Sequence, residues 1–470
     1  MKTKILVILL IVFIAFGFLV YFNKYSSKGT LSVSSNPAGA SIYIQGQLAG
    51  TTPCEVKLPR GTYKVKVSKK GFENYETTID LRGGIKKSVS VSLEKLQYLL
   101  GPIDNAIYKI SSDGKIREKV GGDFGAGIRF FCPLPNGKRI VFSVYHNENK
   151  KSSIWIMDTN GSNKKNLTGN SEIPLFGLFP FPDRRNILFA SSGSKPDFLS
   201  LWTINLNGNK RKITEIKNPA ASLYCIISPD EKKILAYSYD LMESHGPSPL
   251  WIIDSSGKNL KNLTIGMEGK VVSASFFPGG NKILIDFLGS VSKPQLTGLW
   301  VTDPEGKNIK RITKYRESQD SVILSPEILD GGKKIFFVSN QCLWSVNSNG
   351  TNEKLVTAGV SDFYPLSNGK TLLLFDPQFH FLKINTNGTG LKQITGDSTV
   401  KLIKQPYIPK SLFFERWCGN FSPISPDERK VILASDLHTI CCIVSLHTGK
   451  VVDSSGKTVL PLQAFWLPEQ

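Results

Sequence analysis

The stretch that decides the fold is Leu134-Pro135-Asn136-Gly137-Lys138-Arg139-Ile140-Val141-Phe142, because variants of it return six times along the chain. In each copy a tight turn of Pro, Asn, Asp or Gly precedes a run of branched and aromatic residues. This pattern is typical of a β-turn that begins a buried strand. The other copies span residues 181–189, 228–235, 277–285, 329–337, 366–374 and 425–433.

Each copy is followed by a second run that carries Trp or a substitute, then by an Asn/Ser/Gly turn and a closing run. The tryptophans stand 47, 49, 49 and 44 residues apart, at Trp155, Trp202, Trp251, Trp300 and Trp344. The closing runs end in Leu167-Thr168, Ile213-Thr214, Leu263-Thr264, Ile312-Thr313, Val356-Thr357 and Ile394-Thr395. Four short strands in about 45 residues is the period of a β-propeller blade.

We therefore expect an all-β chain whose residues 97–470 form a propeller of seven four-stranded blades. Six or eight blades are the alternatives, because residues 106–116 look like an extra strand pair ahead of the first full repeat. That pair either completes the last blade by pairing with the C-terminal part or belongs to an eighth blade. The repeat resembles the TolB-like, WD40-like propeller repeat over residues 104–455. The resemblance implies the fold more than the function, since such relatives include Tol-system envelope proteins and the non-catalytic propellers of prolyl oligopeptidases.

Residues 29–96 predict a separate small β-domain of alternating strands with Gly, Pro and Asn between them. The order Ser35-Asn36-Pro37-Ala38-Gly39-Ala40, Ile42-Tyr43-Ile44, Gly50-Thr51-Thr52-Pro53, Leu58-Pro59-Arg60-Gly61-Thr62-Tyr63 and Lys70-Gly71-Phe72 resembles the PEGA domain. One departure is Ala38, where the tetrapeptide that names the family has Glu. The strand pattern predicts a short antiparallel β-sandwich or barrel, and the resemblance implies a surface or envelope module with no catalytic role.

The first 28 residues predict a membrane anchor. Lys2 and Lys4 precede an apolar run over residues 5–22, and about eighteen residues are long enough to cross a bilayer as a helix. A cleaved signal peptide is the alternative, but its only small-residue site, Ala15-Phe16-Gly17, lies inside the run. We therefore expect a single-pass membrane protein whose body is extracytoplasmic, either periplasmic or at the cell surface.

The formal charge of +20, from 58 Lys and Arg against 38 Asp and Glu, suggests an anionic partner. Basic pairs stand beside turns throughout the chain, at 69–70, 86–87, 150–151, 164–165, 232–233, 310–311 and 333–334. A nucleic-acid binder concentrates such residues in one stripe with exposed aromatics. We therefore expect no nucleic acid, and a basic surface that faces an anionic envelope.

A search for catalytic chemistry finds no G-x-S-x-G, H-E-x-x-H, Walker or dinucleotide-binding motif. The one His/Cys grouping is His438, Cys441, Cys442 and His447, where a soft-metal site competes with ordinary packing. Neighbouring cysteines on a strand point to opposite faces, which favours packing. We expect no catalytic, cofactor-binding or metal-binding residues, no cofactor and no enzyme activity.

Three recurring features have both a structural and a functional interpretation. The turns at Asp158-Thr159-Asn160-Gly161, residues 254–257 and residues 303–306 suggest calcium loops, but their recurrence favours turn chemistry. The tryptophan series suggests a sugar-stacking ladder, but its spacing favours a core between blades. Glycosylation triplets begin at Asn160, Asn166, Asn262, Asn349, Asn387 and Asn420, the first five as by-products of the repeat.

The sequence thus predicts a non-catalytic scaffold of a prokaryotic cell envelope. It would bind a protein, a peptide or an anionic polymer through a face of the propeller, and the oligomeric state stays open. The alternatives are a structural surface-layer component and an enzyme with its active site in the central funnel.

Overall fold

The computed structural model describes residues 13–14, 28–103, 105–122, 124, 127–169, 175–217, 223–238, 248–314, 323–378, 380–396, 424–434, 441–446, 451–453 and 465–467. The chain divides into two compact units, residues 1–96 (unit 1) and residues 97–470 (unit 2). Apart from two short 3-10 turns, η2 (Pro294–Leu296) and η3 (Asp330–Gly332), the elements described in both units are strands.

Unit 1 is a sandwich of two sheets. The strands are β1 (Gly29–Asn36), β2 (Ser41–Ile44), β3 (Gln47–Thr51), β4 (Cys54–Leu58), β5 (Gly61–Ser68), β6 (Tyr75–Leu81) and β7 (Lys86–Ser92). One sheet has the order β4-β1-β7 and the other the order β3-β2-β5-β6, and only the β1–β7 pair is parallel. The alternating apolar residues of the strands meet in a core that includes Leu31, Val33, Ile42 and Val65.

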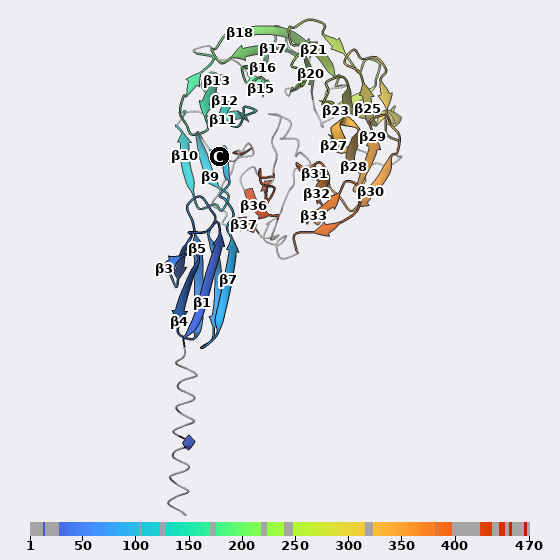
Figure 1. Ribbon diagram of the computed structural model, residues 1–470. Helices are drawn as coiled ribbons and strands as arrows, with labels where there is room; N and C mark the ends of the chain where they lie inside the picture. Colours follow the sequence, from blue (N-terminus) through green and yellow to red (C-terminus); the bar gives the residue numbers. More distant parts are fainter. Residues whose placement is uncertain are drawn as a thin grey trace, which may run out of the picture. The chain divides into compact units, whose positions relative to one another are not determined.

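Unit 2 is a ring of sheets, which we call blades (Figure 1). Within each blade the first strand lies nearest the centre of the ring and the last strand lies at its rim. From the centre outward, blade 1 contains β38 (Phe465–Trp466), β8 (Tyr98–Ile103), β9 (Ala106–Ser111) and β10 (Arg117–Gly121). Blade 2 contains β11 (Gly127–Pro133), β12 (Arg139–His146), β13 (Lys151–Asp158) and β14 (Lys165–Asn166). Blade 3 contains β15 (Leu175–Pro180), β16 (Asn186–Ser192), β17 (Phe198–Asn205) and β18 (Lys210–Lys217), and blade 4 contains β19 (Tyr224–Ile227), β20 (Lys233–Tyr237), β21 (Trp251–Asp254) and β22 (Lys261–Asn262).

Blades 5 to 8 continue the same order. Blade 5 contains β23 (Gly269–Phe276), β24 (Ile283–Gly289), β25 (Gly298–Thr302) and β26 (Lys310–Arg311). Blade 6 contains β27 (Leu324–Leu329), β28 (Lys334–Ser339), β29 (Cys342–Asn347) and β30 (Lys354–Ala358). Blade 7 contains β31 (Asp362–Pro365), β32 (Thr371–Phe375), β33 (Phe381–Asn385) and β34 (Lys392–Gln393), and blade 8 contains β35 (Lys430–Ala434), β36 (Cys441–Ser445) and β37 (Val451–Asp453). The described residues of unit 2 therefore form eight sheets, seven with four strands and one with three, and the expected number of seven blades is not confirmed.

Blade 1 joins the two ends of unit 2. Its innermost strand, β38, pairs antiparallel with β8, with Trp466 opposite Leu99, and the backbone N–H of Leu467 donates to the carbonyl of Tyr98 at 2.8 Å. Ring closure of this kind leaves blade 1 without a turn between its first and second strands. Seven copies of that turn in the sequence therefore correspond to blades 2 to 8.

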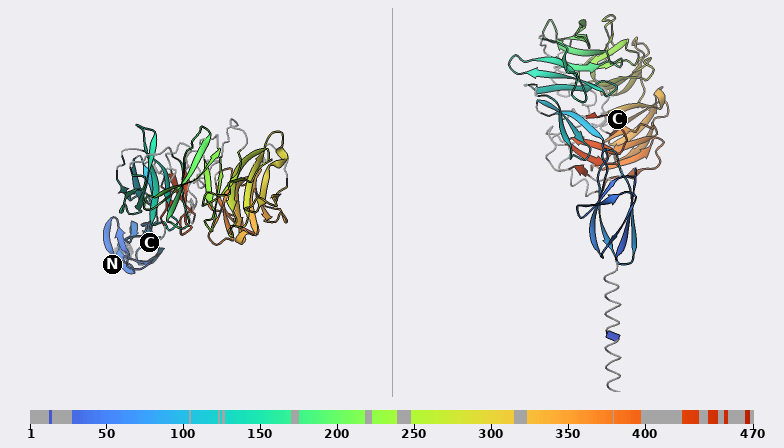
Figure 2. Two further views of the ribbon diagram at one scale, coloured as in Figure 1. Left: turned by 90° about the horizontal axis from the view of Figure 1, so that it is seen from above. Right: turned by 60° about the vertical axis from the view of Figure 1, so that its left-hand side comes forward.

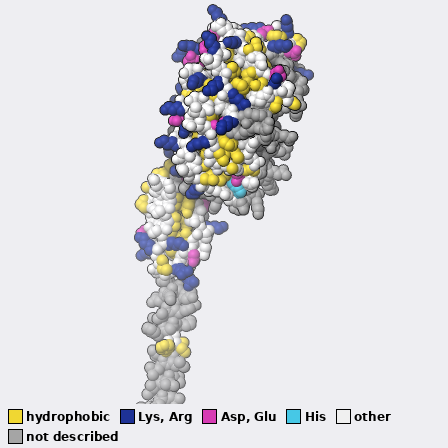
Figure 3. Space-filling model, turned by 90° about the vertical axis from the view of Figure 1, so that its right-hand side faces the viewer, with side chains coloured by type: hydrophobic (Ala, Val, Ile, Leu, Met, Phe, Trp, Pro, Cys, Tyr) yellow, Lys and Arg dark blue, Asp and Glu magenta, His cyan; other side chains and the backbone are white. Residues whose placement is uncertain are grey.

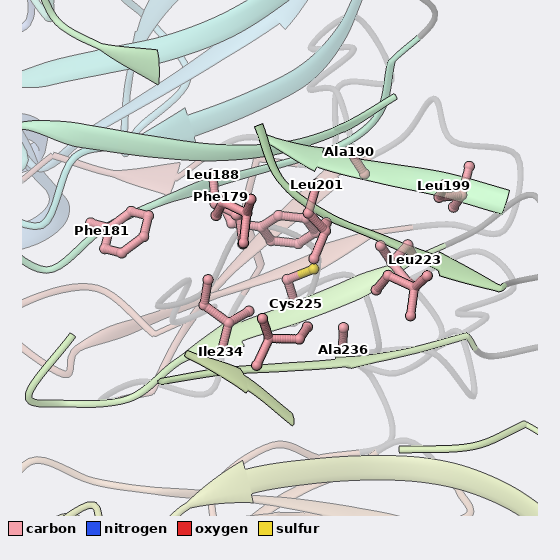
Figure 4. Packing of buried hydrophobic residues seen from close by; sticks show 13 residues of the cluster. Phe179, Phe181, Leu188, Ala190, Leu199, Leu201, Leu223, Cys225, Ile234 and Ala236 are labelled. Atoms are coloured by element: carbon pink, nitrogen blue, oxygen red, sulfur yellow. The ribbon is translucent and has the colours of Figure 1, made fainter. Parts of the chain in front are cut away.

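The core of unit 2 lies between neighbouring blades. Between blades 3 and 4, for example, Phe179, Leu188 and Leu201 meet Cys225 and Ile234 (Figure 4). Burial among these apolar groups raises the pKa of the Cys225 thiol. A similar cluster lies between blades 8 and 1, where Ile443 meets Leu99 and Trp466. Burial between blades removes the apolar sheet faces from water.

The five tryptophans lie where the repeat places them, each against the cluster shared with the preceding blade. Trp155 packs on the cluster of blades 1 and 2, and Trp344 packs on that of blades 5 and 6. The other three, Trp202, Trp251 and Trp300, do the same between blades 2 and 5. The prediction that the series forms a core between blades is confirmed.

In blades 2, 4, 5 and 7, the threonine of the Leu-Thr or Ile-Thr ending fixes the third strand through one hydrogen bond. The hydroxyl oxygen of Thr264 accepts the backbone N–H of Leu250 at 3.1 Å, and that of Thr395 accepts the N–H of Phe381 at 2.8 Å. Thr168 and Thr313 repeat this contact in blades 2 and 5. All four threonines are buried, so each hydroxyl satisfies a donor that would otherwise cost free energy.

The predicted N-terminal transmembrane helix requires a correction. Its residues 5–22 lie outside the described residues, apart from Phe13 and Ile14. Within the part of the chain that the structure describes, no helix has the length and apolar character to cross a membrane. Over the described residues the predicted fold class is therefore corrected to an all-β one, and the single-pass anchor and the localisation derived from it are not supported.

Candidate functional site

The strands of unit 2 run between two faces of the ring (Figure 2), and the antiparallel order makes these faces different. Turns from first to second strands and from third to fourth strands lie on one face, which we call the turn face. Hairpins from second to third strands and the links between blades lie on the other, which we call the connection face.

The turn face is built from repeated hydrogen bonds in which acidic side chains serve the turns. Asp183 accepts the backbone N–H of Arg185 at 2.7 Å and the side-chain amide of Asn186 at 2.8 Å. Asp158, Asp254 and Asp303 each accept the side-chain amide of an Asn five residues later. These contacts favour the turn interpretation over calcium loops. Within the described ranges, no group of three or more His, Cys, Asp or Glu is placed to hold a metal ion.

Some of the basic residues on the turn face link neighbouring blades. Lys165 Nζ donates to the carbonyl of Leu206 in the next blade at 2.9 Å, and Lys310 Nζ donates to that of Asn349 at 3.1 Å. Arg211 does the same with Ser255 at 2.8 Å and Ser256 at 3.0 Å. Part of the positive charge of the chain therefore has a structural use.

The connection face carries polar groups that do not repeat from blade to blade. In blade 2, Arg129 lies in a β-bulge of the innermost strand, and its guanidinium carbon stands 3.4 Å from the ring centre of Tyr145. His146 Nε2 lies 3.0 Å from Ser153 Oγ, which also accepts the indole N–H of Trp155 at 2.9 Å. A cation, an aromatic ring and an imidazole thus gather at one end of this blade.

Blade 3 places a satisfied carboxylate on the same face. Lys212 Nζ lies 2.6 Å from Glu215, the hydroxyls of Ser194 and Ser200 donate to it at 2.6 and 3.0 Å, and the Ser194 N–H donates at 3.1 Å. The Lys212 hydrogen bond, followed by the serine hydroxyls, lowers the pKa of Glu215 to about 2. The cluster fastens the hairpin after β16 to the outermost strand β18.

We expect the Glu215→Gln variant to lose a pH-dependent part of the stability. Because the folded pKa lies below the ordinary value for Glu of about 4.3, the ionised form stabilises the fold above that value. This contribution is lost as the pH falls through about 4 toward about 2. The difference in Tm between the wild type and the variant should thus be largest near neutral pH and shrink in acid. Glu148→Gln, in an exposed hairpin of blade 2, is the matched control; an equal effect there would contradict the assignment.

Blade 7 adds a paired histidine. In the hairpin between β32 and β33, His380 Nδ1 lies 2.9 Å from Asp376 Oδ2, and the His380 N–H donates to Asp376 Oδ1 at 2.8 Å. Both side chains are mostly buried. The carboxylate fixes the orientation of the imidazole ring.

The innermost strands share one irregularity on this face. Registers shift near the start of β11, β15, β23 and β27, the first strands of blades 2, 3, 5 and 6. Bulges at the same level re-aim side chains at the mouth of the ring. The connection face is therefore the candidate ligand-binding surface.

Sequence inspection missed these groups, and its own candidate lies elsewhere. His438 and His447 lie outside the described residues, and of Cys441 and Cys442 only the place in β36 is described. The spacing Asp376-x-x-x-His380 in a predicted hairpin was a usable signal. The Glu215 cluster had none, because its serines stand 15 and 21 residues away.

Two comparisons with known sequences have different outcomes. Residues 28–97 match the PEGA domain family model, which confirms the resemblance noted for residues 29–96. No curated protein sequence matches the chain. The resemblance of unit 2 to the TolB-like repeat stays a prediction.

Solved structures resemble the chain at low identity. An oligogalacturonate lyase from Vibrio parahaemolyticus has a TM-score of 0.46 and 13% identity, with 74% of this chain and 96% of that one covered. A eukaryotic initiation factor has a TM-score of 0.47 and 13% identity, with 80% of this chain and 99% of that one covered. A prolyl endopeptidase has a TM-score of 0.43 and 11% identity, with 76% of this chain and 50% of that one covered. This chain therefore spans half the length of that enzyme.

The expectation that the protein is not an enzyme finds no support in these comparisons, since the lyase and the endopeptidase are themselves enzymes. At such identity the likeness concerns the fold, and it assigns neither an activity nor a catalytic residue. What the matches and the strand order support is that residues 28–97 form a PEGA domain and that unit 2 has a β-propeller-like fold.

Proposed function

We propose that unit 2 is a docking domain that binds a polypeptide segment across the connection face. The observation that carries the proposal is the gathering of unrepeated polar and aromatic side chains on this face, opposite a face of repeated turns. Functional residues concentrate in irregular segments that a rigid scaffold positions. Arg129, which stacks on Tyr145 in the two inner strands of blade 2, is exposed and offers a guanidinium to a ligand.

Apolar contact is available on the same face, in blades 4 and 5. Ile265, in the link from blade 4 to blade 5, is 80% exposed, and Val291, in a hairpin of blade 5, is 95% exposed. The two segments touch, because the Ser290 N–H donates to the carbonyl of Glu268 at 2.9 Å. A peptide that carries both polar and aliphatic side chains fits such a surface better than a purely charged polymer.

A peptide-display selection against the full chain tests the proposal. Peptides that bind should lose about tenfold in affinity with Arg129→Ala or Tyr145→Ala, since both variants remove the stack. Lys392→Gln, on the turn face, is the control and should leave their affinity unchanged. Failure to enrich any peptide, or equal binding by the wild type and the Arg129→Ala variant, would overturn the proposal.

A further inference from the structure

The turn face carries available positive charge, although acidic residues are also present there. The carboxylates bond within the turns: Asp230 accepts from the Ser228 hydroxyl at 2.6 Å, and Asp303 accepts the Lys307 N–H at 2.7 Å. Lys232 and Lys307, which follow these acids, are exposed. Hydrogen bonding thus turns the acids inward and leaves the cations in solvent.

Exposed aliphatic side chains recur among these cations. Ile116, Leu260, Ile309, Leu355 and Leu391 are 42%, 39%, 37%, 49% and 52% exposed, in blades 1, 4, 5, 6 and 7. Each stands at the start of an outermost strand, directly beside a Lys or Arg in the sequence. In unit 2, five of the seven large hydrophobic side chains found exposed among the described residues lie at or next to the first residue of an outermost strand, and Leu260, Ile309 and Leu391 share one position, three residues after the turn glycine.

At the start of these outermost strands, an exposed aliphatic side chain stands next to a Lys or Arg in the sequence. Leu355 follows Lys354 in β30, and Leu391 precedes Lys392 at the start of β34. Figure 3 shows Lys and Arg side chains close to hydrophobic ones on the side of unit 2 that faces the viewer. Single exposed aliphatics need no explanation, but their recurrence at the beginning of the outermost strand in five blades, each beside a cation, does.

We infer that the turn face is a second docking surface, whose partner is an acidic polypeptide with aliphatic side chains among its carboxylates. Carboxylates complement the exposed Lys and Arg, and aliphatic groups cover the partly exposed Leu and Ile. This inference does not rest on the connection-face proposal, which concerns other residues on the opposite face.

Two other anionic partners fit less well. Single-stranded nucleic acid needs aromatic platforms on which bases stack, and every exposed large hydrophobic residue among the described part of unit 2 is aliphatic. An anionic bilayer is flat and meets protruding tips first. Here the aliphatic residues follow polar turn tips such as Asp113-Gly114 and Asn387-Gly388, so they are set back from the tips.

Binding of two labelled probes to the full chain, followed by fluorescence anisotropy, tests the inference. The probes are poly-L-glutamate and a random copolymer of glutamate and leucine of equal charge. We expect the copolymer to bind at least about tenfold more tightly, and both affinities to fall steeply with added salt. Single-stranded DNA and phosphatidylglycerol vesicles should bind more weakly than the copolymer.

Paired variants separate the two contributions. Leu355→Ser with Leu391→Ser should lower copolymer affinity about fivefold and leave that of polyglutamate unchanged. Lys354→Gln with Lys392→Gln should lower the affinity for both probes and make that affinity less dependent on salt. The matched control is Leu48→Ser with Ile85→Ser, which removes two comparably exposed aliphatics in unit 1. Unchanged thermal melting of each variant shows that the fold is intact.

Three results would overturn the inference. They are equal affinity for the two probes, an equal loss in the control pair, and tighter binding of the DNA or the vesicles than of the copolymer. None of these outcomes bears on peptides selected for the connection face, so the two proposals fail separately.

Discussion

Replacing Trp466 with Ala should destabilise unit 2 by about 3 to 5 kcal/mol, as large-to-small changes in packed cores do. Trp466 is 7% exposed and lies in the two-residue strand β38, against Leu99, Ile110 and Ile443. Its loss removes packing from the one blade that holds the ring closed. Neighbouring blades depend on that closure, because each core is shared between two blades.

Urea unfolding followed by circular dichroism measures this effect. The midpoint should fall for Trp466→Ala and stay within error for Val291→Ala, which removes a side chain that is 95% exposed. A loss below about 1 kcal/mol for Trp466→Ala would show that ring closure contributes little to the stability of unit 2.

Substitution of Gly161 by Ala is expected to have a second large effect, because two separate costs combine. Gly161 has φ of +88°, and a Cβ built on it would stand 1.8 Å from the carbonyl oxygen of Val120 in blade 1. A positive φ costs an Ala about 1 to 2 kcal/mol, and overpacking against backbone costs about 1 to 3 kcal/mol more. We therefore expect a loss of about 3 kcal/mol or more.

Gly266→Ala is the matched control for this prediction. Gly266 has φ of +79°, but nothing lies within 4 Å of its Cβ position. It should therefore lose only the conformational part, about 1 kcal/mol. Equal losses for the two variants in urea unfolding would mean that the approach of blade 2 to blade 1 is not tight.

The same contact explains why the repeat keeps its turn glycines. Gly257 of blade 4 would place a Cβ 2.3 Å from the carbonyl oxygen of Ile213 in blade 3, and Gly208 of blade 3 one 2.8 Å from that of Leu167 in blade 2. Ile213 and Leu167 each belong to an Ile-Thr or Leu-Thr ending. Two motifs that stand far apart in the sequence repeat thus meet between blades.

The sequence alone was sufficient to predict the strands of those blades that contain a complete repeat. A turn before a buried strand, a Trp in the third strand and a Thr at the end are local signals, and each has a local physical cause. Blade 1 was predicted only in part: residues 106–116 indicated an extra strand pair, but β38 and β8 are not consecutive and so leave no turn to count. Strand β3 of unit 1 was missed, since Gln47-Leu48-Ala49-Gly50-Thr51 has few residues that favour strands.

The two surfaces were less accessible to prediction than the fold. The basic pairs beside turns were visible in the sequence, but their collection on one face follows only from the antiparallel order. That the acids are engaged also needs coordinates, since Asp254 binds both Asn259 and Lys233, and the latter stands 21 residues earlier. On the connection face, the Arg129–Tyr145 stack depends on a bulge that no local pattern announces.

Ring closure by distant strands also constrains how the chain folds as it leaves the ribosome. Strand β8 is made about 360 residues before β38, so blade 1 waits with an open edge while blades 2 to 8 emerge. An open edge of this kind can pair with a strand of another chain. A nascent chain that stalls before residue 465 would consequently expose both this edge and the apolar side chains of Leu99 and Ile443, which favours aggregation.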